Sequence, residues 1–367
     1  MLVDIHQRYA ELLVHYCLEL QKGERLYVRT SILAEDLVRE VYRTALRAGA
    51  HVEVEFEFRE QGRILLRNGS DEQLQYISPL YREAMEAFDA YLYIRAPYNL
   101  REGQDLDPAR RKLRSEAYAE LNQTYFRRTA DRSLKRNLCQ FPTQAAAQEA
   151  GMSLEAYQHF IYQACGLYED DPMQAWLQVR KEQQHIVDHL NNCTEIRYRS
   201  DAFDISYRTT GRTWINSDGQ TNMPSGEVYT SPVEDSVNGM VHFDYPAIYQ
   251  GKEVQGVSLY VKDGYIEGWE AVQGQDVLDQ VFQIPGTRRF GEAAIGTNYR
   301  IQRFTKNILF DEKIGGTIHM AIGQSYLQCG GKNKSTVHWD MIADMTQSGE
   351  IYADGEKIYE KGRFIFG

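Results

Sequence analysis

Residues 25–58 read RLYVRTSILAEDLVREVYRTALRAGAHVEVEFEF. Both ends of this stretch, 25–29 and 52–58, are rich in β-branched and aromatic residues, and the second alternates them with charged residues, which is typical of strands. Between them, six apolar residues recur at helical spacing before Gly49: Leu37, Val38, Val41, Tyr42, Ala45 and Leu46. A helix between two strands predicts a small α/β domain built on a parallel sheet.

The same alternation continues on both sides of this stretch. Upstream, apolar residues at helical spacing from Ile5 to Leu20 predict a helix that ends before Gly23. Downstream, we expect one helix around Gln73 to Phe88, a strand at 91–96, and mostly helix over 105–190. No GxGxxG or GxxxxGK[ST] motif is present, so the sequence gives no reason to expect a nucleotide.

The pattern changes after about residue 191, where short alternating segments and turn dipeptides dominate. Asp263-Gly264 and Asp354-Gly355 lie between strand-like runs, as in two-residue hairpins. We therefore predict two domains. Residues 1–190 form an α/β domain with a helical extension, and residues 191–367 form an α+β domain rich in antiparallel strands.

Charge limits the class of partner. The chain of 367 residues has a net charge of −11, which argues against nucleic acid as a partner because such binding needs clustered Lys and Arg. One segment, 110–136, is locally basic, with nine Lys or Arg against three acids. It is either a patch for an anionic ligand or, as we favour, a solvated helical face or a subunit contact.

The compartment is predicted from two absences in the sequence. The first twenty residues have charges throughout and no basic leader region, and no run approaches the roughly 18 apolar residues of a membrane span. The five cysteines are scattered and never form a CxxC pair, which favours reduced thiols. We expect a soluble cytoplasmic protein without a membrane partner.

Candidate metal ligands gather in the last third of the chain. In the strand-like run STVHWDMIADM, His338 and Asp340 point to the same face, and His319 lies on the less apolar face of GGTIHMAIG. The pairs Gly226-Glu227 and Gly291-Glu292 add carboxylates beside residues that permit close approach to an ion. Imidazoles with carboxylates suit zinc, manganese, cobalt or iron. The residues alone leave a structural role for each side chain open.

Other catalytic patterns are weaker. His185 and His189 have the spacing of a zinc-binding HExxH helix, but Ile186 stands where that motif has its glutamate, which favours a plain helix surface. No GxSxG motif appears, and no cysteine has a catalytic signature around it.

Ordered blocks along nearly the whole chain resemble a known family, the thermophilic-type metallo-aminopeptidases represented by aminopeptidase T, aminopeptidase S and PepS. The densest blocks are GRTWINSDGQTNMPSGEVYTSPVEDSVNG, GEAAIGTNYRIQ, ILFDEKIGGTIHMAIGQSY and STVHWDMIADM. The resemblance implies a C-terminal catalytic domain that binds two divalent ions, zinc, cobalt or manganese. The implied ligands are six: Glu227, Glu292, Glu312, His319, His338 and Asp340.

The resemblance also implies roles. Glu292 would bridge the two ions, Tyr326 would donate a hydrogen bond to the oxyanion, and Glu227 or Glu292 would carry the proton to the leaving amine. Two extra residues separate Glu312 from His319, compared with the family pattern, and the interval from His319 to His338 is shorter. The implied function is removal of N-terminal residues from short peptides by a metal-activated water, in a homodimer.

Two alternatives belong to other classes. A mononuclear iron dioxygenase of related fold could use His319, His338 and Asp340 as its triad. It would have no need of the three glutamates Glu227, Glu292 and Glu312, which this chain retains. A binding protein that has lost turnover would be expected to lack a ligand or Tyr326, and none is missing. The aminopeptidase is therefore the favoured prediction, with the native metal and the preferred N-terminal residue left open.

Overall fold

The computed structural model describes residues 4–366. The chain divides into two compact units, one of Met1–Met173 with Gly219–Pro224 and the other of Gln174–Asp218 with Ser225–Gly367. The division at residue 190 stays a prediction about domains. Residues 1–3 and 367, which the two predicted domains include, lie outside the described residues.

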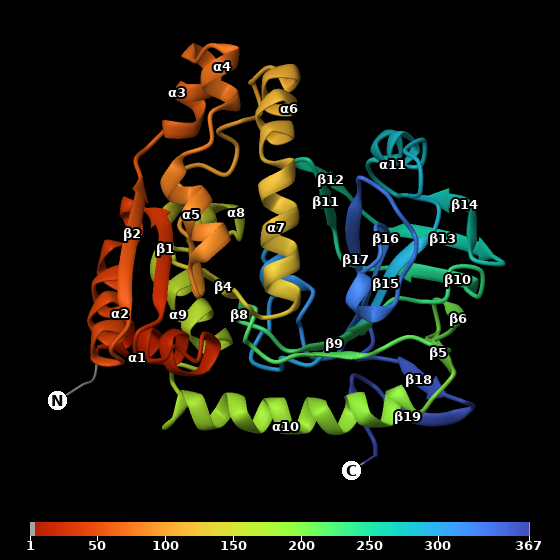
Figure 1. Cartoon of the computed structure of the whole chain (residues 1–367). Coiled ribbons are helices and arrows are strands. Elements are labelled where there is room, and N and C mark those ends of the chain that lie inside the picture. Colours follow the sequence, from red (N-terminus) through yellow and green to blue (C-terminus); the bar gives the residue numbers. More distant parts are fainter. Residues whose placement is uncertain (1–3, 367) are drawn as a thin grey trace. The chain divides into compact units, whose positions relative to one another are not determined.

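The first unit is built on a five-stranded sheet in the order β2-β1-β3-β4-β8, with every neighbouring pair parallel. Its strands are β1 (Arg25–Ser31), β2 (His51–Glu57), β3 (Ala90–Arg95), β4 (Lys135–Gln140) and β8 (Asn222–Met223). Helix α2 (Glu35–Arg47) connects β1 to β2 and buries Leu37, Val38 and Val41, part of the stripe seen in the sequence (Figure 1). The predicted parallel sheet is confirmed.

The remaining helices of this unit are α1 (Ile5–Glu11), η1 (Leu12–Cys17), η2 (Ile32–Ala34), α3 (Gln61–Asn68), α4 (Asp71–Gln75), α5 (Pro79–Ala87), α6 (Pro108–Ala117), α7 (Ala119–Ala130), α8 (Gln144–Glu149) and α9 (Leu154–Ala164). The single helix expected around Gln73 to Phe88 was wrong. It is two helices, because Pro79 starts α5 after an extended Tyr76. Strand β4 interrupts the stretch expected to be mostly helical. It was not predicted because it is specified by its long-range pairing with β3, which its own basic residues do not indicate.

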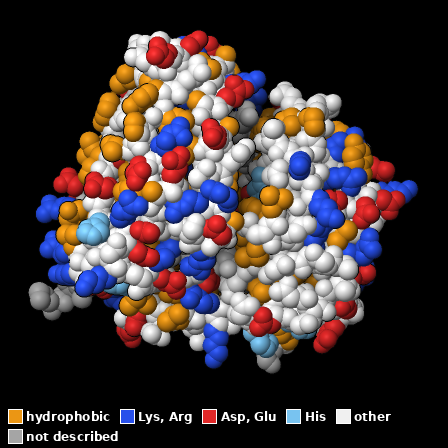
Figure 2. Space-filling model, viewed as in Figure 1, with side chains coloured by type: hydrophobic (Ala, Val, Ile, Leu, Met, Phe, Trp, Pro, Cys, Tyr) orange, Lys and Arg blue, Asp and Glu red, His pale blue; other side chains and the backbone are white. Residues whose placement is uncertain are grey.

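The basic segment 110–136 forms most of α6 and α7, and three of its arginines have structural partners in neighbouring helices. Arg110, Arg114 and Arg128 donate to carbonyl oxygens at the C-terminal ends of α3, α4 and α5. The accepting residues are Leu66 and Gly69, Leu74 and Tyr76, and Met85 and Phe88, respectively. Such carbonyls lack a partner within their own helix. Figure 2 shows basic side chains lying among acidic ones on this face of the molecule.

The second unit holds three antiparallel sheets, as the sequence predicted. The eight-stranded sheet runs β14 (Tyr265–Glu270), β13 (Val257–Lys262), β10 (Asn238–Phe243), β6 (Asp204–Arg208), β5 (Glu195–Arg199), β18 (Glu350–Ala353), β19 (Glu356–Glu360), β20 (Arg363–Phe364). The five-stranded sheet runs β17 (His338–Asp344), β16 (Thr317–Gly323), β15 (Phe290–Gly296), β9 (Glu227–Thr230), β7 (Ile215–Ser217), and β11 (Ala247–Tyr249) pairs with β12 (Lys252–Val254). Helices α10 (Pro172–Asn191), α11 (Gln275–Val281), α12 (Ile308–Asp311) and η3 (Leu327–Cys329) complete the chain.

Both predicted hairpin turns are present. Asp263-Gly264 joins β13 to β14 and Asp354-Gly355 joins β18 to β19. All four turn residues have positive φ, from 47° to 84°. Two successive positive φ values are the requirement that makes Asp-Gly a favoured hairpin dipeptide.

The five-stranded sheet of the second unit, β17-β16-β15-β9-β7, has two unlike faces. One face packs into the main hydrophobic core of this unit, which also includes residues of the eight-stranded sheet. Its core-facing side chains are Val228, Ala293, Ile295, Ile318, Met320, Ile322, Trp339 and Met341. Because strand side chains alternate, the residues between these belong to the opposite face, where the candidate ligands lie.

Candidate metal centre

Strand register brings four predicted ligands to this second face. Glu292 of β15 is paired with Ala321 of β16, and Ala321 is paired with Asp340 of β17. His338 lies two residues before Asp340 on the same strand, and His319 lies two residues before Ala321. Side chains two residues apart on a strand share a face. The predicted orientation of His319, His338 and Asp340 is therefore what the sheet produces.

Glu227 and Glu312 reach the same place from other elements. Glu227 is the first residue of β9, opposite Gly296 of β15, and Glu312 ends the short helix α12. Gly226 has a φ of +115°, and a Cβ atom there would lie 2.7 Å from the Cβ of Asn298. The glycine before Glu227 thus permits close approach of the protein's own chain at Asn298.

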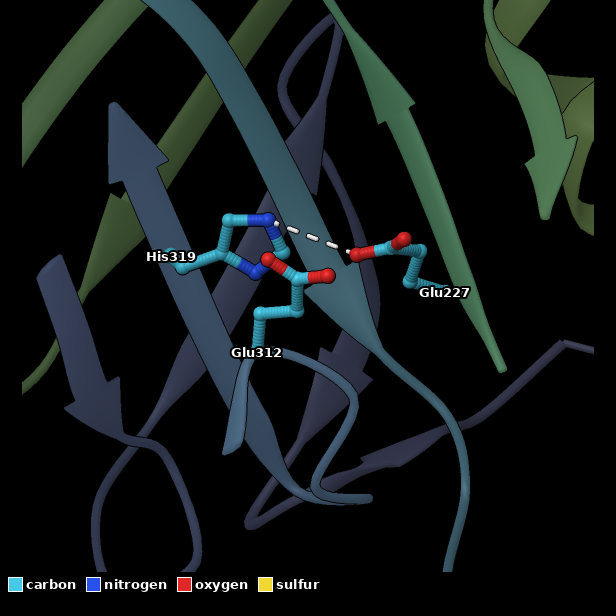
Figure 3. Close-up of side chains that lie close together, drawn as sticks. All are labelled: Glu227, Glu312 and His319. Carbon is cyan, nitrogen blue, oxygen red and sulfur yellow. Dashed lines mark ion pairs between the residues drawn. The ribbon is translucent and has the colours of Figure 1, made fainter. Parts of the chain in front are cut away.

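The six side chains form two groups. Glu227, Glu312 and His319 make up one, which we call cluster 1. The other, cluster 2, comprises Glu292, His338 and Asp340. Within each cluster the candidate ligand atoms lie within 4.8 Å of one another. Figure 3 shows the side chains of cluster 1 converging from β9, from β16 and from the segment that precedes β16. The structure brings together all six residues that the sequence singled out.

Glu292 lies between the clusters. Its Oε2 is 3.0 Å from His338 Nε2, and its Oε1 is 3.7 Å from His319 Nε2. Within the clusters, His319 Nε2 is 3.4 Å from Glu227 Oε2, and His338 Nε2 is 3.3 Å from Asp340 Oδ1. One carboxylate that contacts both imidazoles has the placement that a bridging ligand needs.

The site is strongly negative, and the pKa values of its histidines report this. Burial lowers the pKa of His319, but the neighbouring Glu292 and Glu227 outweigh it and raise that pKa to about 9. Burial likewise opposes the effect of Asp340 and Glu292 on His338, whose pKa rises to about 12. Burial raises the pKa of Glu312. Both histidines thus favour the protonated form that reduces the negative charge of the site, so the pocket attracts cations.

Several polar atoms of the site are buried without a hydrogen-bond partner. They are Glu227 Oε2, His319 Nδ1 and Asp340 Oδ1. Glu227 Oε2 and Asp340 Oδ1 have an ion pair with a histidine but no hydrogen bond. Leaving a buried polar atom unsatisfied costs about 1–3 kcal/mol, so a ligand at this site is expected. Carboxylate oxygens with imidazole nitrogens form the donor set of a divalent transition metal. His338 Nδ1 donates to Gln324 O at 2.8 Å, which leaves Nε2 directed at the cluster. The residues present therefore fit a bound divalent ion.

Tyr326 lies beside cluster 2. Its hydroxyl is 3.4 Å from His338 Nε2, and its ring contacts the rings of His338 and Tyr229. The negative charge of Glu292, together with burial, raises the pKa of Tyr326 well above its ordinary value. The hydroxyl therefore stays protonated and can donate a hydrogen bond.

Sequence reasoning missed Lys313. Its side chain is fully buried, with Nζ 3.6 Å from Glu227 Oε1 and in an ion pair with Glu312. The signal was present, because Asp311-Glu312-Lys313 is a charged triplet inside the otherwise apolar run ILFDEKIGG. The two acids of this triplet have different partners: Glu312 pairs with Lys313, and Asp311 does not take part in that ion pair. Asp311 accepts hydrogen bonds from the backbone N–H and the hydroxyl of Thr305, so it fixes the local turn.

The second histidine pair lies elsewhere. His185 and His189 lie on α10, where both rings contact the ring of Phe366. Neither belongs to a metal-capable group among the described residues. This arrangement agrees with the interpretation of that pair as a helix surface.

Comparison with known proteins now bears on this geometry. The model of the family described as thermophilic metalloprotease (M29) matches residues 4–364. The chain belongs to this family. Aminopeptidase 2 of Geobacillus stearothermophilus is 29% identical, and the match covers 98% of this chain and 97% of the relative. Aminopeptidase AmpS of Bacillus subtilis (strain 168) is 29% identical, over 56% of this chain and 58% of the relative.

A solved structure agrees with the fold of this M29 member. Wild-type AmpT from Thermus thermophilus has a TM-score of 0.85, covers 99% of both chains and is 22% identical in sequence. The family resemblance and the fold class predicted from the sequence are confirmed. As an M29 metalloprotease the chain is a hydrolase that uses divalent metal and acts on peptides. The dioxygenase alternative finds no support among these relatives.

The cytoplasmic location and the homodimer stay predictions. In the part of the chain that the structure describes, no helix is both long and apolar enough to cross a membrane.

Proposed function

We propose that this M29 protein is a dinuclear metallo-aminopeptidase that removes N-terminal residues from short peptides. Cluster 1 would hold one ion, cluster 2 the other, and Glu292 would bridge them. The observation that carries the proposal is the position of Glu292, whose two oxygens face the Nε2 atoms of both His319 and His338. A mononuclear site built on the two histidines and Asp340 has no use for the three further carboxylates, Glu227, Glu292 and Glu312.

Bound divalent ions would lower the pKa of a water molecule and polarise the scissile carbonyl. Selection of the N-terminus would come from the free α-amine of a peptide acting as a ligand at one of the two metal positions, which an acetylated amine cannot do. The chain's own groups do the rest. The protonated Tyr326 hydroxyl donates to the oxygen on which charge develops, and Glu227 or Glu292 carries the proton to the leaving amine.

Finer properties follow the family resemblance. We propose zinc, cobalt or manganese as the resident ion, because the donor set of two imidazoles and four carboxylates accepts all three. We also propose a homodimer in the cytoplasm.

The test is hydrolysis of aminoacyl-p-nitroanilides and their N-acetylated counterparts, after chelation and after adding back zinc, cobalt, manganese or iron. We expect cleavage of the free-amine substrates alone, restored by metal. Glu292→Ala and Asp340→Ala should both abolish activity, whereas Glu267→Ala, at an exposed acid of the same unit, should not. Activity that survives Glu292→Ala would contradict the dinuclear site. No cleavage with any metal would overturn the aminopeptidase proposal.

A further inference from the structure

Lys313 is an unusual neighbour for a metal site. It is the only fully buried lysine or arginine among residues 4–366. Its ammonium contacts both carboxylates of cluster 1, Glu227 and Glu312. The ion pairs of cluster 2 involve its own members and His319, and none of them includes a lysine or arginine in the described chain. One cluster therefore has a built-in cation in contact with its carboxylates and the other does not.

The backbone fixes this lysine in place. Lys313 N–H donates to Phe310 O at 3.0 Å, and Lys313 O accepts from Asn298 N–H at 3.0 Å. Asn298 O accepts from Gly315 N–H, also at 3.0 Å, and the Asn298 side chain donates to Ser225 O. Lys313 is thus held by the same residue that packs against Gly226, directly before Glu227. The ammonium reaches cluster 1 because of how the chain folds, not through a free loop.

A charge count shows the consequence. Each cluster contains two carboxylates and one imidazole, so a divalent ion bound to neutral imidazole and two ionised carboxylates gives a net charge of zero. In cluster 1 the lysine adds one positive charge a few ångströms from the ion position. Two cations in a buried site repel each other strongly, because little solvent screens them. The same ammonium is also the present partner of the carboxylates that the ion needs.

We propose that Lys313 makes the two metal positions unequal: cluster 2 takes a divalent ion first and holds it tightly, and cluster 1 takes a second, exchangeable ion in competition with the lysine ammonium. The inference rests on the proposed dinuclear site and adds an order of loading to it. In this proposal Lys313 controls how tightly cluster 1 binds its ion, and it does not contact the substrate.

The experiment is calorimetric titration of the metal-free full chain with Zn²⁺, and separately with Co²⁺, without peptide. The wild type should bind two equivalents in two steps of different affinity. Lys313→Met keeps the length of the side chain and removes its charge. We expect it to tighten the weaker step by about tenfold or more and to leave the tighter step nearly unchanged. Equal or weaker binding of the second ion in Lys313→Met would overturn the proposal.

A matched control separates a local effect from a change in overall charge. Lys357 also contacts two carboxylates, Glu350 and Glu360, but lies at the surface of the same unit. Lys357→Met should leave both binding steps as in the wild type. If it tightens the weaker step as much as Lys313→Met does, the effect is one of net charge and the proposal fails.

Assignment of the steps does not depend on whether Lys313→Met folds. Glu312→Gln in the otherwise unchanged chain should remove the weaker step, and Asp340→Asn should remove the tighter one. Two steps of equal affinity in the wild type, or the reverse assignment, would overturn the proposal. Because binding is read without substrate, loss of peptidase activity with two-step binding intact would count against the proposed function and leave the unequal sites standing.

Discussion

Two charged regions of this molecule, the basic segment 110–136 and the acidic clusters 1 and 2, behave differently in the structure. Three arginines of α6 and α7, Arg110, Arg114 and Arg128, donate to carbonyl oxygens at the ends of α3, α4 and α5, and so have structural partners. The carboxylates and imidazoles of clusters 1 and 2 are buried or half-buried, and three of their atoms have no hydrogen-bond partner. The arginines therefore stabilise the fold, whereas the side chains of clusters 1 and 2 are expected to bind a ligand.

The largest effect that we expect from testing this difference is on stability, when metal is added to or removed from clusters 1 and 2. Metal that binds only the folded protein should raise the free energy of unfolding by about 4 kcal/mol at a free ion concentration of roughly 1,000 times Kd. Thermal unfolding with Zn²⁺ and with a chelator measures this difference. The double variant His319→Ala, His338→Ala serves as the control and should show no metal dependence. An equal metal effect in that variant would place the ion elsewhere.

The next effect is on catalysis at the same site. Tyr326→Phe removes one hydroxyl donor and keeps the ring, so activity should fall about 100-fold or more while metal binding is retained. Steady-state kinetics with an aminoacyl-p-nitroanilide gives the loss, and metal analysis of the same sample shows whether the site is intact. Tyr260→Phe is the matched change at an exposed tyrosine on β13. Unchanged kcat in Tyr326→Phe would remove this residue from the mechanism.

A smaller effect is expected among the arginines. Arg128→Met leaves the carbonyls of Met85, Phe88 and Ser133 without their donor and should lower the free energy of unfolding by about 1–3 kcal/mol. The neighbouring Arg127 is exposed, so Arg127→Met should change it by less than about 0.5 kcal/mol. Denaturant unfolding of both variants tests the comparison. Similar losses in the two would mean that the carbonyl contacts do not matter.

The smallest effect concerns a charge that already has its partners. Burial raises the pKa of Glu234, but the Lys332 N–H and the Arg212 guanidinium outweigh burial and lower that pKa below its ordinary value of 4.5. An acid with a depressed pKa stabilises the fold above its unfolded-state pKa, and that contribution is lost as pH falls through the folded-state value. Glu234→Gln should therefore lose less stability than the wild type as the pH falls below about 4.5. Parallel stability curves for the two proteins would contradict this.

Local sequence patterns were enough to predict much of the fold. The alternation in residues 51–57 and the apolar stripe of α2 were enough to predict β2 and its connection, because both depend on side chains near in sequence. The Asp-Gly turns were equally local. Strand β8 could not be predicted, since Asn222–Met223 joins the sheet of the first unit through pairing with distant residues of β4. Short strands of that kind are specified by their neighbours and not by their own two residues.

The candidate site divides in the same way. The family blocks led to all six side chains of the two clusters, and the strand period put His338 and Asp340 on one face. Lys313 was missed because a lysine is ordinarily solvated, and only the packing of Asn298 against its backbone shows that this one is buried. The capping role of Arg128 was also invisible, because its acceptors lie about forty residues earlier in the chain.

The most direct measurement is anomalous diffraction from crystals of the full chain grown with Zn²⁺ or Co²⁺. The account predicts two peaks, each about 2.0–2.2 Å from ligand atoms, one in cluster 1 and the other in cluster 2, with Glu292 between them. A single peak held by His319, His338 and Asp340, with Glu227 and Glu312 outside ligand distance, would contradict it.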